Sequence, residues 1–160
     1  MCGAMTTPPA PFRMRILIVG IGNPDRGDDG AGILAARELA DLTSEGTDVV
    51  ESNGDVGELL DRWAGVEAVY VIDAVCSGYP PGTIHCFHGP QVPSAWASLT
   101  STHGLGLAQA IDLARALDRL PRELFVYGVE AHAYTPGAGM SPEVQRAVAE
   151  VVCRIRRQVQ

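Results

Sequence analysis

The chain has 160 residues, of which 46% are hydrophobic, and its formal net charge at pH 7 is −7. This length and apolar content predict one globular domain, and no apolar run approaches the roughly 18 residues that a membrane-spanning helix needs. The acidic balance disfavours a nucleic-acid partner. The twelve basic residues include no lysine, which excludes a Walker-type phosphate lysine.

The N-terminal segment and the cysteines bear on domain organisation and on the compartment. Residues 1–12 contain three prolines and no periodicity, so we expect a flexible tail before a single domain over residues 13–160. The four cysteines, Cys2, Cys76, Cys86 and Cys153, form no C-x-x-C pair. We expect reduced thiols and a cytoplasmic location, with a Cys76–Cys86 bridge across a hairpin as the alternative.

A glycine-rich stretch over residues 20–32 lies between two regular elements. Residues 15–19 form a short, mostly apolar run that predicts a buried strand, and residues 33–40 have apolar positions at helical spacing. The adjacent acids Asp28 and Asp29 stand where the helix should begin. We expect one of them to cap the helix, which leaves the other to face the crevice at the carboxyl end of the strand.

Strands and helices alternate along the rest of the chain. We expect strands over residues 47–52, 68–72, 83–88 and 124–129, and helices over residues 56–63, 105–120 and 142–157. The last helix begins with Ser141 at the N-cap and Pro142 at the first helical position. This order predicts a three-layer α/β/α sandwich with a mostly parallel, twisted sheet of about five strands. The hairpin around residue 80 predicts one antiparallel edge strand.

Three polar residues stand at comparable ends of these elements. Asp29 follows the first strand, Asp73 closes the strand over residues 68–72, and His103 lies at the start of the long helix. Each alone is as well explained by a helix cap, a hydrogen bond at a strand end or a loop position. Together, at the carboxyl edge of one parallel sheet, they favour a site. Two carboxylates and an imidazole suit a divalent transition ion such as nickel or zinc and leave coordination positions open.

The other candidate side chains have weaker patterns. His85 and His88 are three residues apart on a predicted strand, so they point to opposite faces, and we expect them to be exposed. His132 follows the last strand and is a candidate for a group behind the metal ligands. Cys76 lies three residues past Asp73. No G-x-S-x-G nucleophile elbow occurs.

Four motifs occur in order along the chain. They are Ile18–Asn23, Gly27–Gly32, Val71–Ala74 and Ser101–Gly104. This series resembles the motifs of the NiFe-hydrogenase maturation endopeptidases, and the similarity extends over residues 14–158. The resemblance implies a protease that removes the C-terminal extension of a hydrogenase large-subunit precursor after nickel insertion. From the acidic charge and the lack of a long apolar run, we expect no nucleic-acid or membrane partner.

The resemblance also implies roles for individual residues. The metal-contacting residues of the family fall on Asp29, Asp73 and His103, and the nickel is presented by the precursor, with zinc or cadmium as other ions in vitro. Many members have Glu at the first position; Asp29 is shorter by one methylene, and Asp28 is the alternative ligand. As a mechanism, we expect the metal to polarise the scissile carbonyl or activate water, and Asp28 to move the proton. The predicted catalytic set is therefore Asp28, Asp29, Asp73 and His103.

Three other functions remain alternatives. The Gly20-x-Gly22 turn is also found in dinucleotide-binding proteins, but residue 25 is Asp where the third glycine belongs, and two acids stand where a pyrophosphate would bind. Peptidyl-tRNA hydrolases share a Gly-x-Gly-Asn-Pro opening, although the acidic charge argues against that function. A non-catalytic nickel-binding or hydrogenase-docking factor would use the same three ligands.

Overall fold

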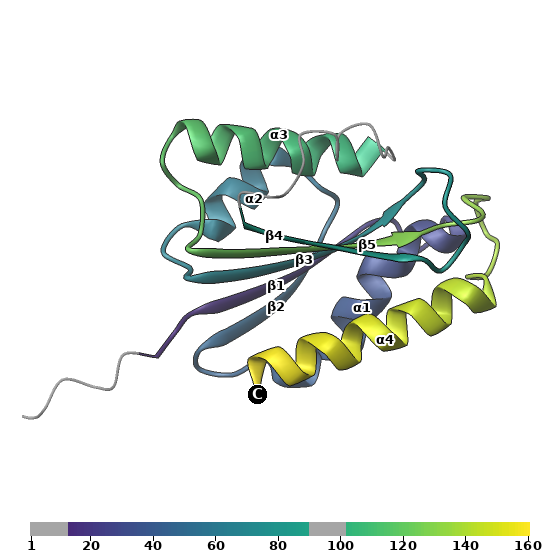
Figure 1. Cartoon of the computed structure of the whole chain (residues 1–160), viewed down its shortest axis with the longest axis horizontal. Helices are drawn as coiled ribbons and strands as arrows, with labels where there is room; N and C mark the ends of the chain where they lie inside the picture. The colour runs from purple at the N-terminus through teal and green to yellow at the C-terminus, as the bar shows by residue number, and fades with distance from the viewer. Residues whose placement is uncertain (1–12, 90–101) are drawn as a thin grey trace, which may run out of the picture.

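A five-stranded sheet lies between two layers of helices (Figure 1). The computed structural model describes residues 13–89 and 102–160, apart from the side chains of residues 102–105. The strands are β1 (Ile16–Ile21), β2 (Thr47–Ser52), β3 (Ala68–Val75), β4 (Ile84–His88) and β5 (Glu123–Glu130). The helices are α1 (Ala31–Leu39), α2 (Val56–Trp63), α3 (Thr102–Ala116) and α4 (Pro142–Val159), with short 3-10 helices η1 (Gly27–Gly30) and η2 (Ala40–Leu42).

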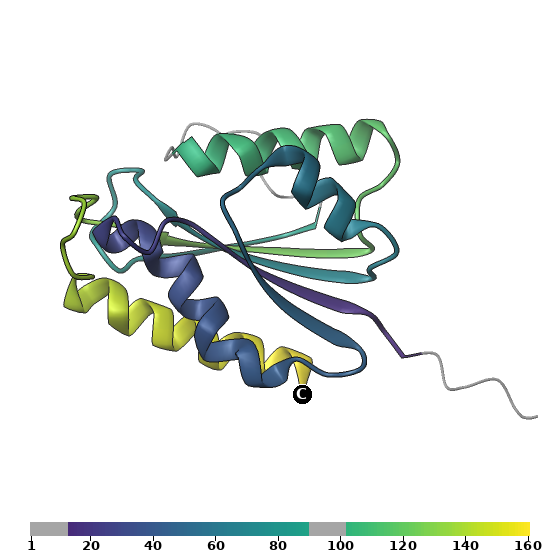
Figure 2. The same cartoon turned by 180° about the vertical axis from the view of Figure 1, so that it is seen from behind.

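The strand order confirms the predicted fold class. The strands lie in the order β2-β1-β3-β5-β4; the first four run parallel, and β4 pairs antiparallel with β5 at the edge. The antiparallel strand is the second arm of the predicted hairpin. The sheet is twisted, as Figure 2 shows from behind.

Each face of the sheet has its own hydrophobic core. Helices α1 and α4 cover one face and α2 and α3 the other (Figures 1 and 2). Every residue of β3 is buried, because this strand is central in the sheet and covered on both faces. In the described ranges, no helix combines the length and apolarity that a bilayer crossing requires.

Several elements differ from the predicted bounds. β1 continues through Gly20 and Ile21 because both residues pair with neighbouring strands, and β3 continues to Val75, which places Asp73 inside a strand. α3 begins at Thr102 and ends at Ala116, so both of its ends lie a few residues earlier than those of the predicted helix over residues 105–120. The predicted tail over residues 1–12 lies outside the described residues.

The predicted capping of the first helix is wrong. Gly30, and neither Asp28 nor Asp29, occupies the N-cap position of α1. Both acids belong to the 3-10 turn η1, whose carbonyl groups accept the first helical amides; the Ala31 N–H donates to the carbonyl of Asp28. Because the turn supplies these acceptors, the two carboxylates serve other contacts.

Candidate active site

The start of α1 touches the carboxyl ends of β1 and β3. A Cβ atom added to Gly32 would lie 2.3 Å from the carbonyl oxygens of both Ile21 and Ile72, so only glycine fits there. The chain leaves β1 through α1 on one face of the sheet, whereas α3, after β3 and β4, covers the other face. This is the topological switch point, where open α/β sheets bind their ligands.

Two of the predicted site residues, Asp29 and Asp73, flank this switch point. Asp29 is 1% exposed and lies three residues before Gly32, while Asp73 is 0% exposed and directly follows Ile72. The charges of both carboxylates also contribute to the raised pKa of Tyr134. Burial, followed by the charges of Cys76, Asp29, Asp73 and Glu130, raises the pKa of that phenol far above its ordinary value. The structure therefore places both acids, buried, at the same edge of the sheet, on either side of the switch point.

His103, the third predicted ligand, lies in the first turn of α3, at the start of the helix as predicted. This helix covers the sheet face to which Asp73 points, because Val71 and Val75, the alternate residues of β3, pack in the core beneath α2 and α3. The imidazole itself is outside the described side chains, and the described side chains alone form no cluster of three metal ligands. The three-residue metal site thus stays a prediction.

Asp28 makes a different set of contacts from its neighbour. Its Oδ2 accepts hydrogen bonds from the backbone amides of His132 and Ala133 at 2.7 and 3.0 Å, and its Oδ1 accepts one from the Ser141 amide at 2.7 Å. The Ser141 hydroxyl donates to the same carboxylate. Burial alone would raise the pKa of Asp28, but these hydrogen bonds outweigh it and lower the pKa. These contacts favour a structural role for Asp28, in which its carboxylate holds a loop in place. The predicted role of Asp28 in proton transfer stays a prediction.

The segment that Asp28 fastens is the loop between β5 and α4, residues 131–141. The backbone of η1 adds to the attachment, since the Asp28 amide donates to the carbonyl of Ala133 at 2.8 Å and the Gly137 amide donates to that of Asp25 at 2.9 Å. The loop carries Tyr134, whose buried hydroxyl finds no hydrogen-bond partner among residues 13–89 and 102–160. Asp28 therefore positions a phenol beside the two site acids.

A fourth buried acid, Glu130, is not among the predicted site residues. It is the last residue of β5 and is 1% exposed. Its carboxylate accepts hydrogen bonds from the amide and hydroxyl of Ser77, and Nε2 of His85 lies 2.8 Å from Oε1. The prediction that His85 is exposed is wrong, because its side chain is only 16% exposed. An acid at the very end of a buried strand, as Glu130 is, was the available signal.

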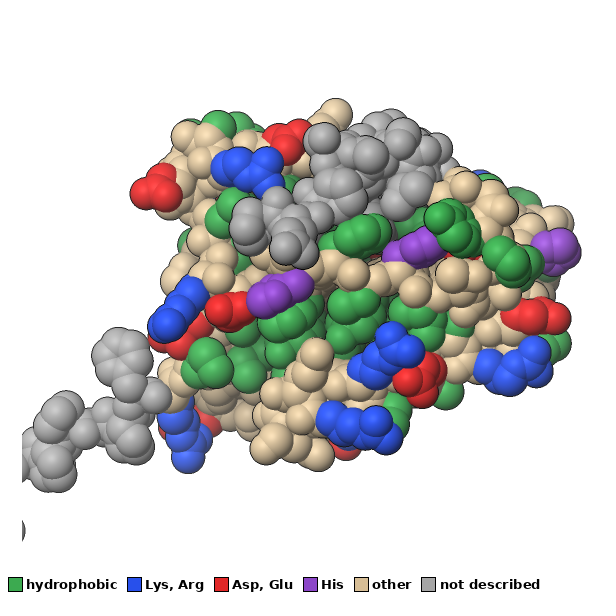
Figure 3. Space-filling model, viewed as in Figure 1, with side chains coloured by type: hydrophobic (Ala, Val, Ile, Leu, Met, Phe, Trp, Pro, Cys, Tyr) green, Lys and Arg blue, Asp and Glu red, His purple; other side chains and the backbone are tan. Residues whose placement is uncertain are grey.

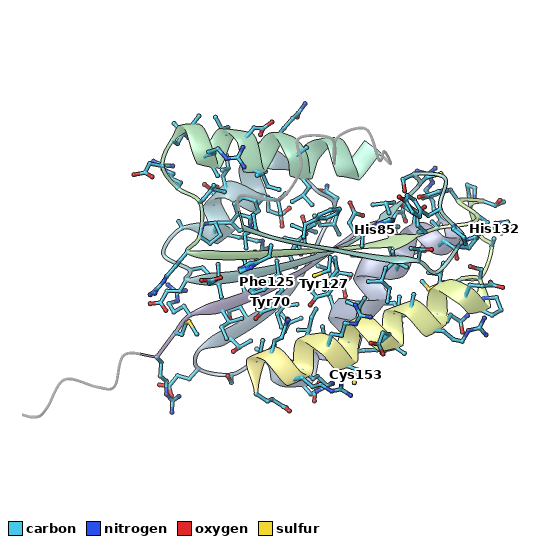
Figure 4. All side chains as sticks on the ribbon, viewed as in Figure 1. Tyr70, His85, Phe125, Tyr127, His132 and Cys153 are labelled. Atoms are coloured by element: carbon cyan, nitrogen blue, oxygen red, sulfur yellow. The ribbon has the colours of Figure 1, made fainter. Side chains whose placement is uncertain are left out.

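The remaining histidines lie at the surface, where histidine side chains are visible on one face of the molecule (Figure 3). His88 is 53% exposed and pairs with Glu123, on the opposite face of β4 from His85, as predicted. The side chain of His132 is exposed at the end of β5, away from the sheet (Figure 4). Only its backbone amide takes part in the site region, through Asp28.

The chain is similar to proteins of one family. The model of the hydrogenase maturation protease family matches residues 36–158, a range that includes Asp73 and His103 and begins after Asp29. The Hydrogenase 2 maturation protease of Escherichia coli K12 is 28% identical over 138 residues, which cover 84% of each chain. Protein FrxA of Pyrococcus furiosus is 34% identical over 125 residues, which cover 76% of this chain and 88% of that protein.

Solved structures agree with the sequence comparisons. The NiFe hydrogenase maturation protease HybD from Thermococcus kodakarensis superposes with a TM-score of 0.77 at 31% identity and covers 92% of this chain and 100% of its own. The hydrogenase maturating endopeptidase HybD from Escherichia coli has a TM-score of 0.78 at 25% identity, over 91% of this chain and 94% of that one.

Proposed function

This chain belongs to the hydrogenase maturation protease family, and we propose that it removes the C-terminal extension of a NiFe-hydrogenase large-subunit precursor after nickel insertion. It is a protease, as its relatives and structural neighbours are. The proposal concerns the substrate, the cleaved segment and the dependence on nickel.

The observation that carries the proposal is the burial of Asp29 and Asp73 together at the switch point of the sheet. Ionised carboxylates are costly to bury, and a bound cation is one of the few partners that offsets that cost. With an imidazole from His103 in the first turn of α3, the donor set is two oxygens and one nitrogen. That set fits a borderline divalent ion such as nickel.

We propose that the nickel belongs to the substrate. Asp29, Asp73 and His103 would bind the ion that the precursor already holds, so only a loaded precursor would be positioned for cleavage. The ion, when bound, supplies Lewis acidity that polarises the scissile carbonyl. Zinc or cadmium would occupy the same ligands in vitro.

Other residues of this chain keep the site in shape. Asp28 holds the loop between β5 and α4 against η1, and thereby keeps Tyr134 next to the acids. Gly32 allows the start of α1 to lie against Ile21 of β1 and Ile72 of β3, at the switch point that Asp29 and Asp73 flank. Three free thiols, Cys76, Cys86 and Cys153, support the expected cytoplasmic location of the protein and its precursor.

The alternative functions are less well supported. The family match and the named relatives favour a protease over a non-catalytic docking factor. Asp28 and Asp29 are buried in the turn where a dinucleotide phosphate would have to approach, which argues against a nucleotide site. The net charge of −7 argues against a peptidyl-tRNA substrate.

The test is mass spectrometry of a large-subunit precursor before and after incubation with this protein. We expect the nickel-loaded precursor to lose a C-terminal peptide and the nickel-free precursor to stay intact. Equal cleavage of both forms would contradict the role of nickel in recognition, and an intact loaded precursor would contradict the proposed substrate.

A further inference from the structure

Glu130 connects the end of β5 to the segment that joins β3 and β4. Its buried carboxylate takes hydrogen bonds from Ser77, and Nε2 of His85 lies 2.8 Å from Oε1. Its backbone amide donates to the carbonyl of Thr83 at 2.9 Å, and its carbonyl accepts from the amide of Gly82 at 2.8 Å. Because the Glu130 carboxylate has several hydrogen-bond partners, its position is fixed. The imidazole of His85 that is bonded to it is therefore held in one orientation.

The ring of His85 is also contacted on a second side. The ring of Tyr79, an exposed residue, meets it edge to face at a centroid distance of 5.0 Å and an angle of 83°. Because Glu130 occupies Nε2, the imidazole has Nδ1 left for another partner. Its side chain is 16% exposed, so a molecule bound at the carboxyl edge of the sheet can approach it.

His85 shares a cross-strand row with a proposed metal ligand. Asp73 pairs with Gly128, and Gly128 pairs with His85, so the three residues lie side by side on β3, β5 and β4. Side chains of one row point to the same face of a sheet, and for Asp73 that face is the one that holds Val71 and Val75 in the core under α2 and α3. Gly128 contributes no side chain between its neighbours. With strands about 4.8 Å apart, the outer two Cα atoms are about 10 Å apart.

Peptide hydrolysis needs a proton donor that the described acids do not supply. The departing amine must gain a proton as the C–N bond breaks. Asp28 has a lowered pKa and a carboxylate engaged with the loop, and the raised pKa of Tyr134 makes its phenol a reluctant donor. Asp29 and Asp73 act as ionised ligands in the proposed function.

We propose that His85, oriented by Glu130, is a catalytic residue that protonates the departing amine. This inference rests on the proposed proteolytic function. The oxygen of water bonds to the acyl carbon, and the C–N bond breaks with its electron pair remaining on nitrogen, which takes the proton from Nδ1. The proton that the attacking water loses returns the imidazole to its charged form, so atoms and charge balance. Glu130 is the positioning residue of this pair.

Several titratable groups surround this imidazole. Glu130 faces it from β5, and Asp73 lies across Gly128 on β3. The segment between β3 and β4 adds Tyr79, whose ring meets the imidazole edge to face. The proposed step therefore predicts that activity falls on the alkaline side as the imidazolium form is lost.

The experiment compares cleavage of nickel-loaded precursor by the wild-type chain and His85→Gln, from about pH 5 to about pH 9. The glutamine amide can still donate to Glu130 but cannot titrate. We expect kcat to fall about 10²- to 10⁴-fold with little change in KM, and the alkaline limb of the pH profile to be lost. His88→Gln is the matched control, because this exposed histidine lies on the other face of the same strand, and we expect it to behave as wild type.

A second variant keeps the proposal testable if His85→Gln fails to fold. Glu130→Gln keeps an acceptor for Ser77 but removes the charge beside the imidazole, and we expect a smaller loss of kcat in the same direction. Wild-type cleavage with an unchanged pH profile for His85→Gln would overturn this inference alone. A wild-type chain that leaves the loaded precursor intact would overturn the proposed function as well.

Discussion

The carboxylate of Asp28 accepts hydrogen bonds from both the amide and the hydroxyl of Ser141, which lies 113 residues further along the chain. Ser141 occupies the N-cap position of α4, yet its hydroxyl makes no capping bond and donates to Asp28 instead. One buried carboxylate thereby joins the turn after β1 to the start of the last helix.

We expect Asp28→Asn to lower the free energy of unfolding at neutral pH by about 3 kcal/mol. The asparagine has one acceptor oxygen and places an amide donor among backbone donors. Chemical denaturation measures the difference. The exposed Asp25→Asn is the matched control in the same turn, and we expect it to change the free energy of unfolding by less than about 0.5 kcal/mol.

The effect of Asp28 should also depend on pH. Its folded pKa is lowered, so its contribution to stability is complete above the unfolded value of about 3.9 and is lost as the pH falls through the folded pKa. We expect the wild-type and Asp28→Asn free energies of unfolding to converge as the pH falls below about 4. A difference that stays constant through this range would contradict the assignment.

We expect Gly32→Ala to destabilise the chain by about 3 kcal/mol or more. The added methyl group would meet two backbone carbonyl oxygens, of Ile21 and Ile72, that belong to central strands and cannot move aside. Gly57→Ala on α2 is the control, since its Cβ would lie 3.4 Å from Oδ1 of Asp55, an ordinary contact, and alanine favours a helix. Thermal unfolding of both variants checks the difference; equal melting temperatures would contradict the close packing of α1.

We expect Tyr134→Phe to raise the free energy of unfolding by about 1 kcal/mol. The change removes a buried hydroxyl that has no hydrogen-bond partner within the described ranges. Tyr127→Phe is the matched comparison and should be destabilising by a similar amount, because the Tyr127 hydroxyl donates to Oε1 of Gln158 at 3.1 Å. Urea denaturation measures the change in the free energy of unfolding for both variants. A lower free energy of unfolding for Tyr134→Phe would show that the wild-type Tyr134 hydroxyl is hydrogen-bonded.

The elements were predictable where the signals are local. β2 and α2 have the predicted bounds. Turn residues end β2, and Asp55 caps α2 by accepting a hydrogen bond from the amide of Glu58. Leu59 and Trp63 are the buried stripe of α2. The apolar runs of β3 and β5 likewise predicted the parallel centre of the sheet, and hence that Asp73 lies at its carboxyl edge.

The contacts between distant segments were not predictable in the same way. His85 and Glu130 are 45 residues apart, and nothing in the pattern around His85 distinguishes a bonded imidazole from an exposed one. The two adjacent acids of η1 looked equivalent in sequence. Their roles differ because the loop between β5 and α4 reaches Asp28, and that loop has no regular pattern of its own.

The proposed nickel-binding role of Asp73 is tested most directly by single-turnover cleavage of nickel-loaded precursor. The measurement compares the wild-type chain with Asp73→Asn, and with Asp61→Asn as an exposed acidic control on α2. We expect Asp73→Asn to cleave at least about 100-fold more slowly, because an amide is a poorer ligand than a carboxylate, and Asp61→Asn to cleave at the wild-type rate. Cleavage by a folded Asp73→Asn at the wild-type rate would contradict the proposed site.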